Sequence, residues 1–198
     1  IQDSLARRVE NLGEVAWVSQ DVPKRLGMLC MFGAVKPWLF NAADIETLRP
    51  ALPPSTGSAA FQEQLSAVKR EADQTDRDKM RIVHFWADGT GTYTPPGHWN
   101  AFAFEEIYNA GQSEVRAARN FALLNMAMMD AAIICWETKY HYMVPRPTQM
   151  DPEIKTLTGL PNFPAYTSGH SSFSATGATV LGHLFPAKAS TFDAWANE

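Results

Sequence analysis

The sequence predicts a single all-α domain, and three observations support this fold class. Apolar residues recur at helical spacing through most of the 198 residues, helix start signals precede several of these stretches, and no strictly alternating run indicates a strand. The length is sufficient for one domain with a buried core. A proline-rich loop at residues 48–58 is the best internal boundary. We therefore expect residues 1–57 to be peripheral and residues 58–198 to form the core.

The predicted helices follow one another along the chain with few long interruptions. They cover residues 3–18, 59–72, 75–87, 99–110, 113–140 and 170–185. Ser58 is a suitable N-cap for the second helix. Thr75 and Asp78 form a weak capping box for the third. Turn-rich sequence over residues 88–98 separates the third helix from the fourth.

The fifth predicted helix is the longest, and it is apolar on most sides, so we expect it to be central. Pro145 and Pro147 prevent its continuation, and they predict extended chain at Arg146. A loop containing Pro161 and Pro164 then leads to the last helix, which begins near His170.

Composition excludes several classes of protein. The net charge is −4 and no basic stripe is present, so we expect no nucleic-acid partner. The longest apolar stretch is interrupted by Asn125 and Asp130, and we expect a soluble protein without a membrane span. Cys30 and Cys135 give no disulfide framework, so the compartment stays open, with a secreted or periplasmic location among the options.

The start of the last helix carries the residues with the clearest chemistry. Ser168, Gly169 and His170 offer a hydroxyl, an unhindered amide and a group that titrates near neutral pH. Unpaired amides and the helix dipole favour an anion there. Lys139 and Arg146 supply two cations that could hold a tetrahedral oxyanion. The alternatives are two surface cations and an ordinary N-cap followed by an incidental histidine.

Two of these segments match a family pattern when they are taken together. The Lys-x6-Arg-Pro stretch at residues 139–147 and Thr-Ser-Gly-His at residues 167–170 resemble the type 2 phosphatidic acid phosphatase and vanadium haloperoxidase superfamily, with Thr167 in place of the usual proline. Further segments are similar to the vanadium chloroperoxidases. These are Trp136, Phe163-Pro164-Ala165-Tyr166, Phe85-Trp86-Ala87-Asp88-Gly89 and Thr94-Pro95-Pro96. The resemblance spans residues 81–185.

The resemblance implies a helical bundle of the acid phosphatase and vanadium haloperoxidase type, with vanadate as its cofactor. Phosphate or sulfate is expected to fit the same site. The implied binding residues are Lys139, Arg146, Ser168, Gly169 and His170. Lys139 and His170 are the implied catalytic residues, polarising the bound group and transferring protons. The implied small-molecule partners are hydrogen peroxide, a halide and an organic acceptor, and assembly into a homo-oligomer is common in the family.

Three further residues have roles implied by the same resemblance. Trp136 and Phe163 are expected to border the halide pocket. In the family, the acid that matches Asp88 pairs with an oxyanion-binding arginine, so Asp88 is expected to orient Arg146.

The family's third motif, Ser-Arg-x5-His-x3-Asp, is not found in these 198 residues. It supplies the histidine that acts as nucleophile in the phosphatases and as axial vanadium ligand in the haloperoxidases. His183 is a poor substitute, because 13 residues of helix separate it from His170 by about 20 Å. We expect a C-terminally incomplete core that binds oxyanions weakly with little turnover. A soluble acid phosphatase and a catalytically incompetent oxyanion-binding domain remain the alternatives to a haloperoxidase.

Overall fold

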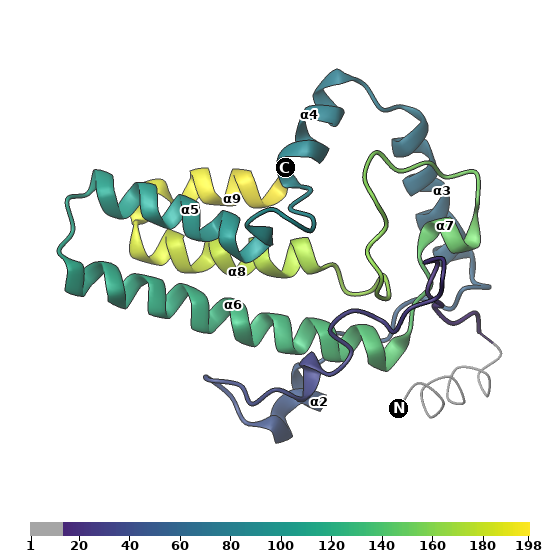
Figure 1. The fold of residues 1–198 in the computed structure, drawn as a ribbon, viewed down its shortest axis with the longest axis horizontal. Helices are drawn as coiled ribbons and strands as arrows, with labels where there is room; N and C mark the ends of the chain where they lie inside the picture. The colour runs from purple at the N-terminus through teal and green to yellow at the C-terminus, as the bar shows by residue number, and fades with distance from the viewer. Residues whose placement is uncertain (1–13) are drawn as a thin grey trace.

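The computed structural model describes residues 14–198, and these residues form helices and loops without a strand (Figure 1). The helices are α2 (Ile45–Leu48), α3 (Ala59–Asp73), α4 (Arg77–Trp86), α5 (Thr94–Asn109), α6 (Glu114–Tyr142), α7 (Pro147–Met150), α8 (Gly169–Leu184) and α9 (Ala189–Asn197). Short 3₁₀ turns lie at Phe32–Ala34, Ala42–Asp44 and Pro186–Lys188. The predicted all-α fold is confirmed.

Helix α8 lies at the centre of a bundle, where it packs against α5, α6 and α9 (Figure 1). Helices α5 and α8 run in the same direction, so their N-terminal ends lie at the same end of the bundle. Trp99 of α5 is fully buried and donates from Nε1 to the hydroxyl of Ser174 in α8 at 3.3 Å. A Cβ atom at Gly177 would lie 2.3 Å from the Trp99 ring, so the glycine permits this close approach.

Helix α6 is the longest helix, as its sequence predicts, but it forms the long side of the bundle and α8 takes the central position. Leu124, Met128 and Ile133 are buried in the core. The segment Glu114–Met150 is long and apolar enough to cross a membrane, with a mean hydropathy of 1.3, but 44% of its most apolar window is buried inside the structure. The core helix of a globular bundle has these same properties, so length and hydropathy give only weak evidence for a span.

The helix boundaries follow the predicted caps in most places. Ser58 caps α3 by accepting a hydrogen bond from the amide of Phe61 at 3.2 Å, as expected. The prediction for α4 is wrong by one residue: Asp76, rather than Thr75, is the N-cap and accepts from the amide of Lys79 at 2.8 Å. The Thr75 hydroxyl instead donates to the carbonyl of Ala72 at the end of α3, so it is not available to α4.

Two elements differ from the prediction at larger scale. Helix α5 begins at Thr94, before the predicted residue 99, because Pro95 and Pro96 occupy its first turn, where the missing amide protons cost nothing. Helix α9 follows the Pro186–Lys188 turn and was not expected. Phe192 of α9 is fully buried and completes the bundle against α8.

The predicted helix at residues 3–18 lies mostly outside the described residues, and residues 14–18 are not helical. Instead, this part of the chain is extended and runs along the end of α6. The amide of Trp17 donates to the carbonyl of Met143 at 2.7 Å, and the Trp17 side chain is buried.

Further along, the same N-terminal segment is tied to the middle of α6 and to the loop before α8. The carboxylate of Asp130 accepts from the amides of Trp38 at 2.8 Å and Leu39 at 2.6 Å. The amide of Met28 donates to the carbonyl of Asn162 at 2.7 Å. The segment therefore supports the loop that leads into the candidate site.

Candidate oxyanion site

The predicted site residues come from the end of α6, the chain that follows it, and the start of α8. Helix α6 ends at Tyr142, and Met143 takes a left-handed conformation with φ of 52°. Arg146 then lies on extended backbone as the N-cap of α7, with φ −68° and ψ 146°. The prolines on both sides of Arg146 therefore act as expected. The loop after α7 returns to α8 at the same end of the bundle (Figure 1).

Lys139 lies inside the protein, with 1% of its surface exposed. Its ammonium group donates to the carbonyl of Pro164 at 2.9 Å, to that of Ala165 at 3.1 Å, and to that of Thr167. An ammonium group has three protons, so all of its donors are used within the protein. Burial lowers the pKa of Lys139 to about 8, with a further lowering by the charge of Arg146 and an opposite effect of Cys135.

Arg146 is the second cation, and it has an unused donor. Its Nε donates to the carbonyl of Phe163 at 2.9 Å, whereas Nη2 is buried and has no acceptor among the described residues. No carboxylate in residues 14–198 pairs with it. Burial lowers the pKa of Arg146 to about 10, so the guanidinium remains charged at neutral pH.

The ring of Phe163 connects the two cations. The Nζ atom of Lys139 lies 4.8 Å from the ring centre, and the guanidinium carbon of Arg146 lies 4.9 Å from it. Both distances allow cation–π attraction. Two positive charges therefore lie close together, and neither forms an ion pair with a carboxylate in the described part of the chain.

Trp136 packs beside this pair. Its ring centre is 5.4 Å from that of Phe163, and its Nε1 is a second buried donor without an acceptor in the described part of the chain. Most buried polar groups in folded proteins have a partner. The two side chains that carry unused N–H donors, Trp136 and Arg146, therefore pack against the same phenylalanine.

The N-terminus of α8 supplies further donors. Ser168 is the N-cap, and its oxygen accepts from the amide of Ser171 at 3.2 Å, which leaves its hydroxyl proton free to donate. The amides of Gly169 and His170 have no acceptor among residues 14–198, as is usual for the first turn of a helix. A Cβ atom at Gly169 would touch Trp136 at 3.5 Å, an ordinary contact, and would meet no other atom nearby. The backbone is therefore open on the side away from Trp136.

The structure links five of the predicted residues by the contacts described above, namely Trp136, Lys139, Arg146, Phe163 and Gly169. Ser168 adjoins Gly169 as the N-cap of α8, and His170 follows it in the first turn; both residues are exposed. No hydrogen bond or ion pair in the described residues joins His170 to the two cations.

The predicted pairing of Asp88 with Arg146 is not found. The carboxylate of Asp88 instead lies 2.9 Å from Nδ1 of His98, and both side chains are almost fully buried. Asp88 follows α4 and His98 lies in the second turn of α5, so the turn between these helices folds the two residues onto each other. The pair holds the α4–α5 connection together.

His98 was not assigned a role from the sequence, yet it is the centre of an aromatic cluster. The ring centres of Phe85, Trp86, Phe102 and Tyr93 lie between 4.7 and 5.1 Å from that of His98. A histidine ten residues after an acid, across a turn, is the signal in the sequence that could have revealed the pair.

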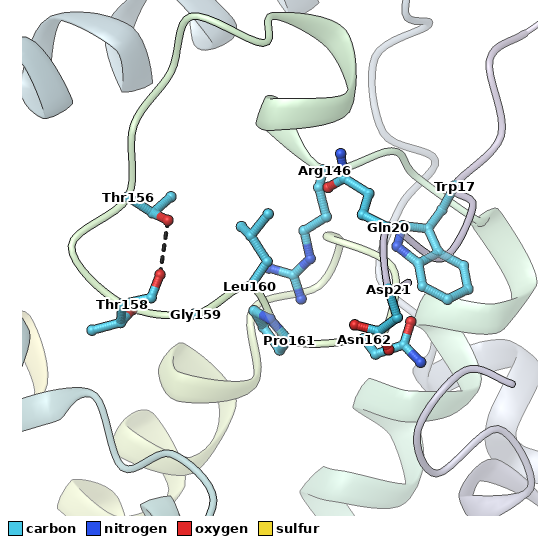
Figure 2. Close-up of a pocket in the computed structure, with 10 residues that line it drawn as sticks. All are labelled: Trp17, Gln20, Asp21, Arg146, Thr156, Thr158, Gly159, Leu160, Pro161 and Asn162. Atoms are coloured by element: carbon cyan, nitrogen blue, oxygen red, sulfur yellow. Dashed lines mark hydrogen bonds between the residues drawn. The ribbon is translucent and has the colours of Figure 1, made fainter. Parts of the chain in front are cut away.

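A pocket of about 340 Å³ lies beside Arg146 (Figure 2). Its walls are Trp17, Gln20, Asp21, Arg146, Thr156, Thr158, Gly159, Leu160, Pro161 and Asn162. The guanidinium of Arg146 points toward Leu160 and Pro161 in this view. The volume is within the range of small-molecule sites. The other predicted site residues do not line this pocket.

The fold and the site define a helical-bundle protein in which two buried cations lie next to the start of a helix. A family model described as the VCPO second helical-bundle domain matches residues 119–158, which include Trp136, Lys139 and Arg146. A solved structure of a bacterial vanadium-dependent iodoperoxidase is similar to the chain, with a TM-score of 0.73 and 25% sequence identity. No curated protein sequence matches significantly.

The similarity to the iodoperoxidase covers 86% of this chain and 45% of the solved chain, so the 198 residues span less than half the length of that enzyme. Together, the family model and the solved structure show that the chain is similar to the vanadium haloperoxidases, in sequence over residues 119–158 and in fold over most of its length.

Proposed function

We propose that these residues form the oxyanion-binding part of a vanadium-dependent haloperoxidase that oxidises a halide with hydrogen peroxide. One observation carries the proposal: Arg146 Nη2 and Trp136 Nε1 are buried donors without acceptors in the described residues, and the two side chains pack against the same phenylalanine. Vanadate would supply acceptor oxygens to Arg146, and a halide ion beside it would accept from Trp136.

The residues present fit such an anion in three ways. Arg146 has a planar group that can bind two oxygens at once. The hydroxyl of Ser168 and the amide of Gly169 have unused donors at the positive end of α8. The charge of Lys139 adds attraction from below the loop, although its protons are already bonded to carbonyls. Bound vanadate would supply the electrophilic centre that activates peroxide toward the halide.

His170 and the aromatic pair have separate parts in this proposal. His170 is exposed on the first turn of α8, next to the amides that would face the anion, and its imidazole would serve as the acid and base of the reaction. Trp136 and Phe163 would form the halide pocket, where Trp136 Nε1 is a donor for the ion. Since the similar solved enzyme is an iodoperoxidase, iodide is the first halide to test.

The axial histidine of the family motif is not among the 198 residues. His183 lies on the same helix as His170, about 20 Å away by helical rise. For this chain by itself we therefore propose anion binding with little turnover, and halide oxidation is a proposal for the whole protein.

The decisive experiment is a vanadate titration of the 198-residue chain followed by ⁵¹V NMR or calorimetry. We expect saturable binding that phosphate competes with. Arg146→Gln removes a charge-assisted donor worth about 1.5–3 kcal/mol, so affinity should fall about 10- to 150-fold. Arg81→Gln is the matched control, because Arg81 pairs with Glu198 on the surface and its loss should leave affinity unchanged.

Two results would count against the proposal. Equal vanadate affinity of the wild type and Arg146→Gln would exclude the proposed vanadate site at Arg146. In a longer form that carries the third motif, phosphate-ester hydrolysis that vanadate inhibits, without iodide oxidation, would favour the acid phosphatase alternative. Absence of both activities in that form would favour an oxyanion-binding domain without catalysis.

A further inference from the structure

The role of Lys139 in this structure differs from the role that the family resemblance implies. The resemblance makes this lysine a direct ligand of the oxyanion. Here its three ammonium protons are bonded to three carbonyl oxygens, and the side chain is buried. A lysine has no fourth donor. To reach an anion, Lys139 would have to release one buried carbonyl, and this carbonyl would then lack a partner.

The three carbonyls belong to one short stretch that lacks secondary structure. They come from Pro164, Ala165 and Thr167, immediately before the N-cap Ser168. Three carbonyls of one short stretch that turn toward the same point repel each other unless a cation lies between them. The ammonium group of Lys139 is that cation, so it determines the conformation of this stretch.

The other hydrogen bonds of the stretch come from several different parts of the chain. The amide of Ala165 donates to the carbonyl of Val144 at 3.0 Å, and the hydroxyl of Tyr166 donates to the carbonyl of Ala51 at 3.0 Å. The hydroxyl of Thr167 lies 3.4 Å from the sulfur of Cys135. None of these contacts orients more than one peptide unit, whereas Lys139 orients three.

We propose that Lys139 is a positioning residue. Its three hydrogen bonds hold residues 164–167 in one conformation, and this conformation positions Ser168 and Gly169 at the start of α8. The anion contacts come from Arg146 and the α8 N-terminus. This inference rests on the proposed function only where it names the groups that contact the anion, because the hydrogen bonds between Lys139 and the loop do not depend on a ligand.

Hydrogen exchange in the absence of vanadate tests directly whether Lys139 holds residues 164–167 in place. Lys139→Met keeps the length of the side chain and removes all three donors. We expect exchange of the amides in residues 163–170 to accelerate about tenfold or more, while amides in the middle of α6 keep their protection. Arg81→Gln is the matched control: Arg81 pairs with Glu198 at the surface and forms no hydrogen bond or ion pair with residues 163–170 in the described part of the chain, so the loop protection should stay unchanged.

A second measurement uses the wild-type protein, so it remains informative if Lys139→Met does not fold. The ¹⁵N signal of the Lys139 ammonium group is followed during a vanadate titration. A signal that stays nearly unchanged at saturation supports the positioning role. A large shift, with loss of coupling to one carbonyl, would show a direct ligand and overturn the inference.

The two proposals can fail separately. If vanadate does not bind at all, the proposed function fails, and the loop protection still decides the role of Lys139. If Lys139→Met keeps full loop protection but loses vanadate affinity, the proposed vanadate site is supported and the positioning role of Lys139 is wrong.

Discussion

The packing of α5 against α8 gives the most quantitative prediction for this protein. Gly177→Ala would place a Cβ atom 2.3 Å from one atom and 2.6 Å from two others of the Trp99 ring. Trp99 is fully buried and its Nε1 is bonded to Ser174, so the ring has little freedom to move. Overpacking of this kind costs about 3 kcal/mol. Alanine recovers about 1 kcal/mol as the better helix former. We expect a net loss of about 2 kcal/mol.

Thermal unfolding followed by circular dichroism measures this effect. For a chain of this size, a loss of about 2 kcal/mol lowers Tm by about 4–8 °C. Gly182→Ala is the matched control in the same helix, because its Cβ would meet the Cβ of Ala189 at 3.3 Å, a contact that a small shift relieves. It should change stability by less than about 1 kcal/mol. If Gly177→Ala is as stable as Gly182→Ala, the close approach of Trp99 to α8 is incorrect.

The remaining predictions concern charge and hydrogen bonding. Asp130→Asn should lower the free energy of unfolding by about 2–3 kcal/mol, because two backbone amides lose a charged acceptor; a urea-melt difference below about 0.5 kcal/mol would contradict it. Asp88→Asn should destabilise the protein through His98 and leave vanadate affinity within about twofold, whereas a loss of about tenfold would restore the predicted link to Arg146. In a form that turns over, Trp136→Phe should raise KM for iodide and leave vanadate affinity unchanged; an unchanged KM would remove the indole from the halide pocket. The pKa of Lys139 is about 8 in the folded state, below its ordinary 10.5, so between these values the unfolded chain binds the additional proton and stability rises with pH. The neighbouring Arg146 stays charged up to about pH 10. The urea midpoint of the wild type should therefore rise from pH 8 to 10 relative to that of Lys139→Met. If the midpoints of the two proteins depend on pH in the same way, the lowered pKa of Lys139 is wrong.

Local signals were sufficient to predict most of the bundle. The apolar length of α6 and the cap at Ser58 depend on neighbours within a few residues, and both were correctly predicted. Thr75 was assigned the wrong cap because a hydroxyl can bond backward or forward, and the choice depends on how α3 ends. Helix α9 is short, and the burial of Phe192 against α8 gives it stability that its sequence alone does not show.

The bonding of the candidate site residues could not be predicted from the sequence, and their role at a site stays a prediction. The prolines correctly predicted that Arg146 lies on extended chain. The three carbonyls around Lys139 come from a loop whose path depends on tertiary contacts, so no local pattern indicates them. Asp88 was assigned to the wrong partner for the same reason, since His98 approaches it only through the turn between α4 and α5.

The contacts of the N-terminal segment have a consequence for the order of folding. Asp130 is bonded to residues that precede it by 91 and 92 positions, and Asn162 is bonded to Leu26 across 136 positions. Contacts between such distant residues form late, because a long loop of chain must close first. During synthesis, the N-terminal segment must wait until the loop before α8 has left the ribosome. The segment that supports the loop before α8 is therefore synthesised first and ordered among the last.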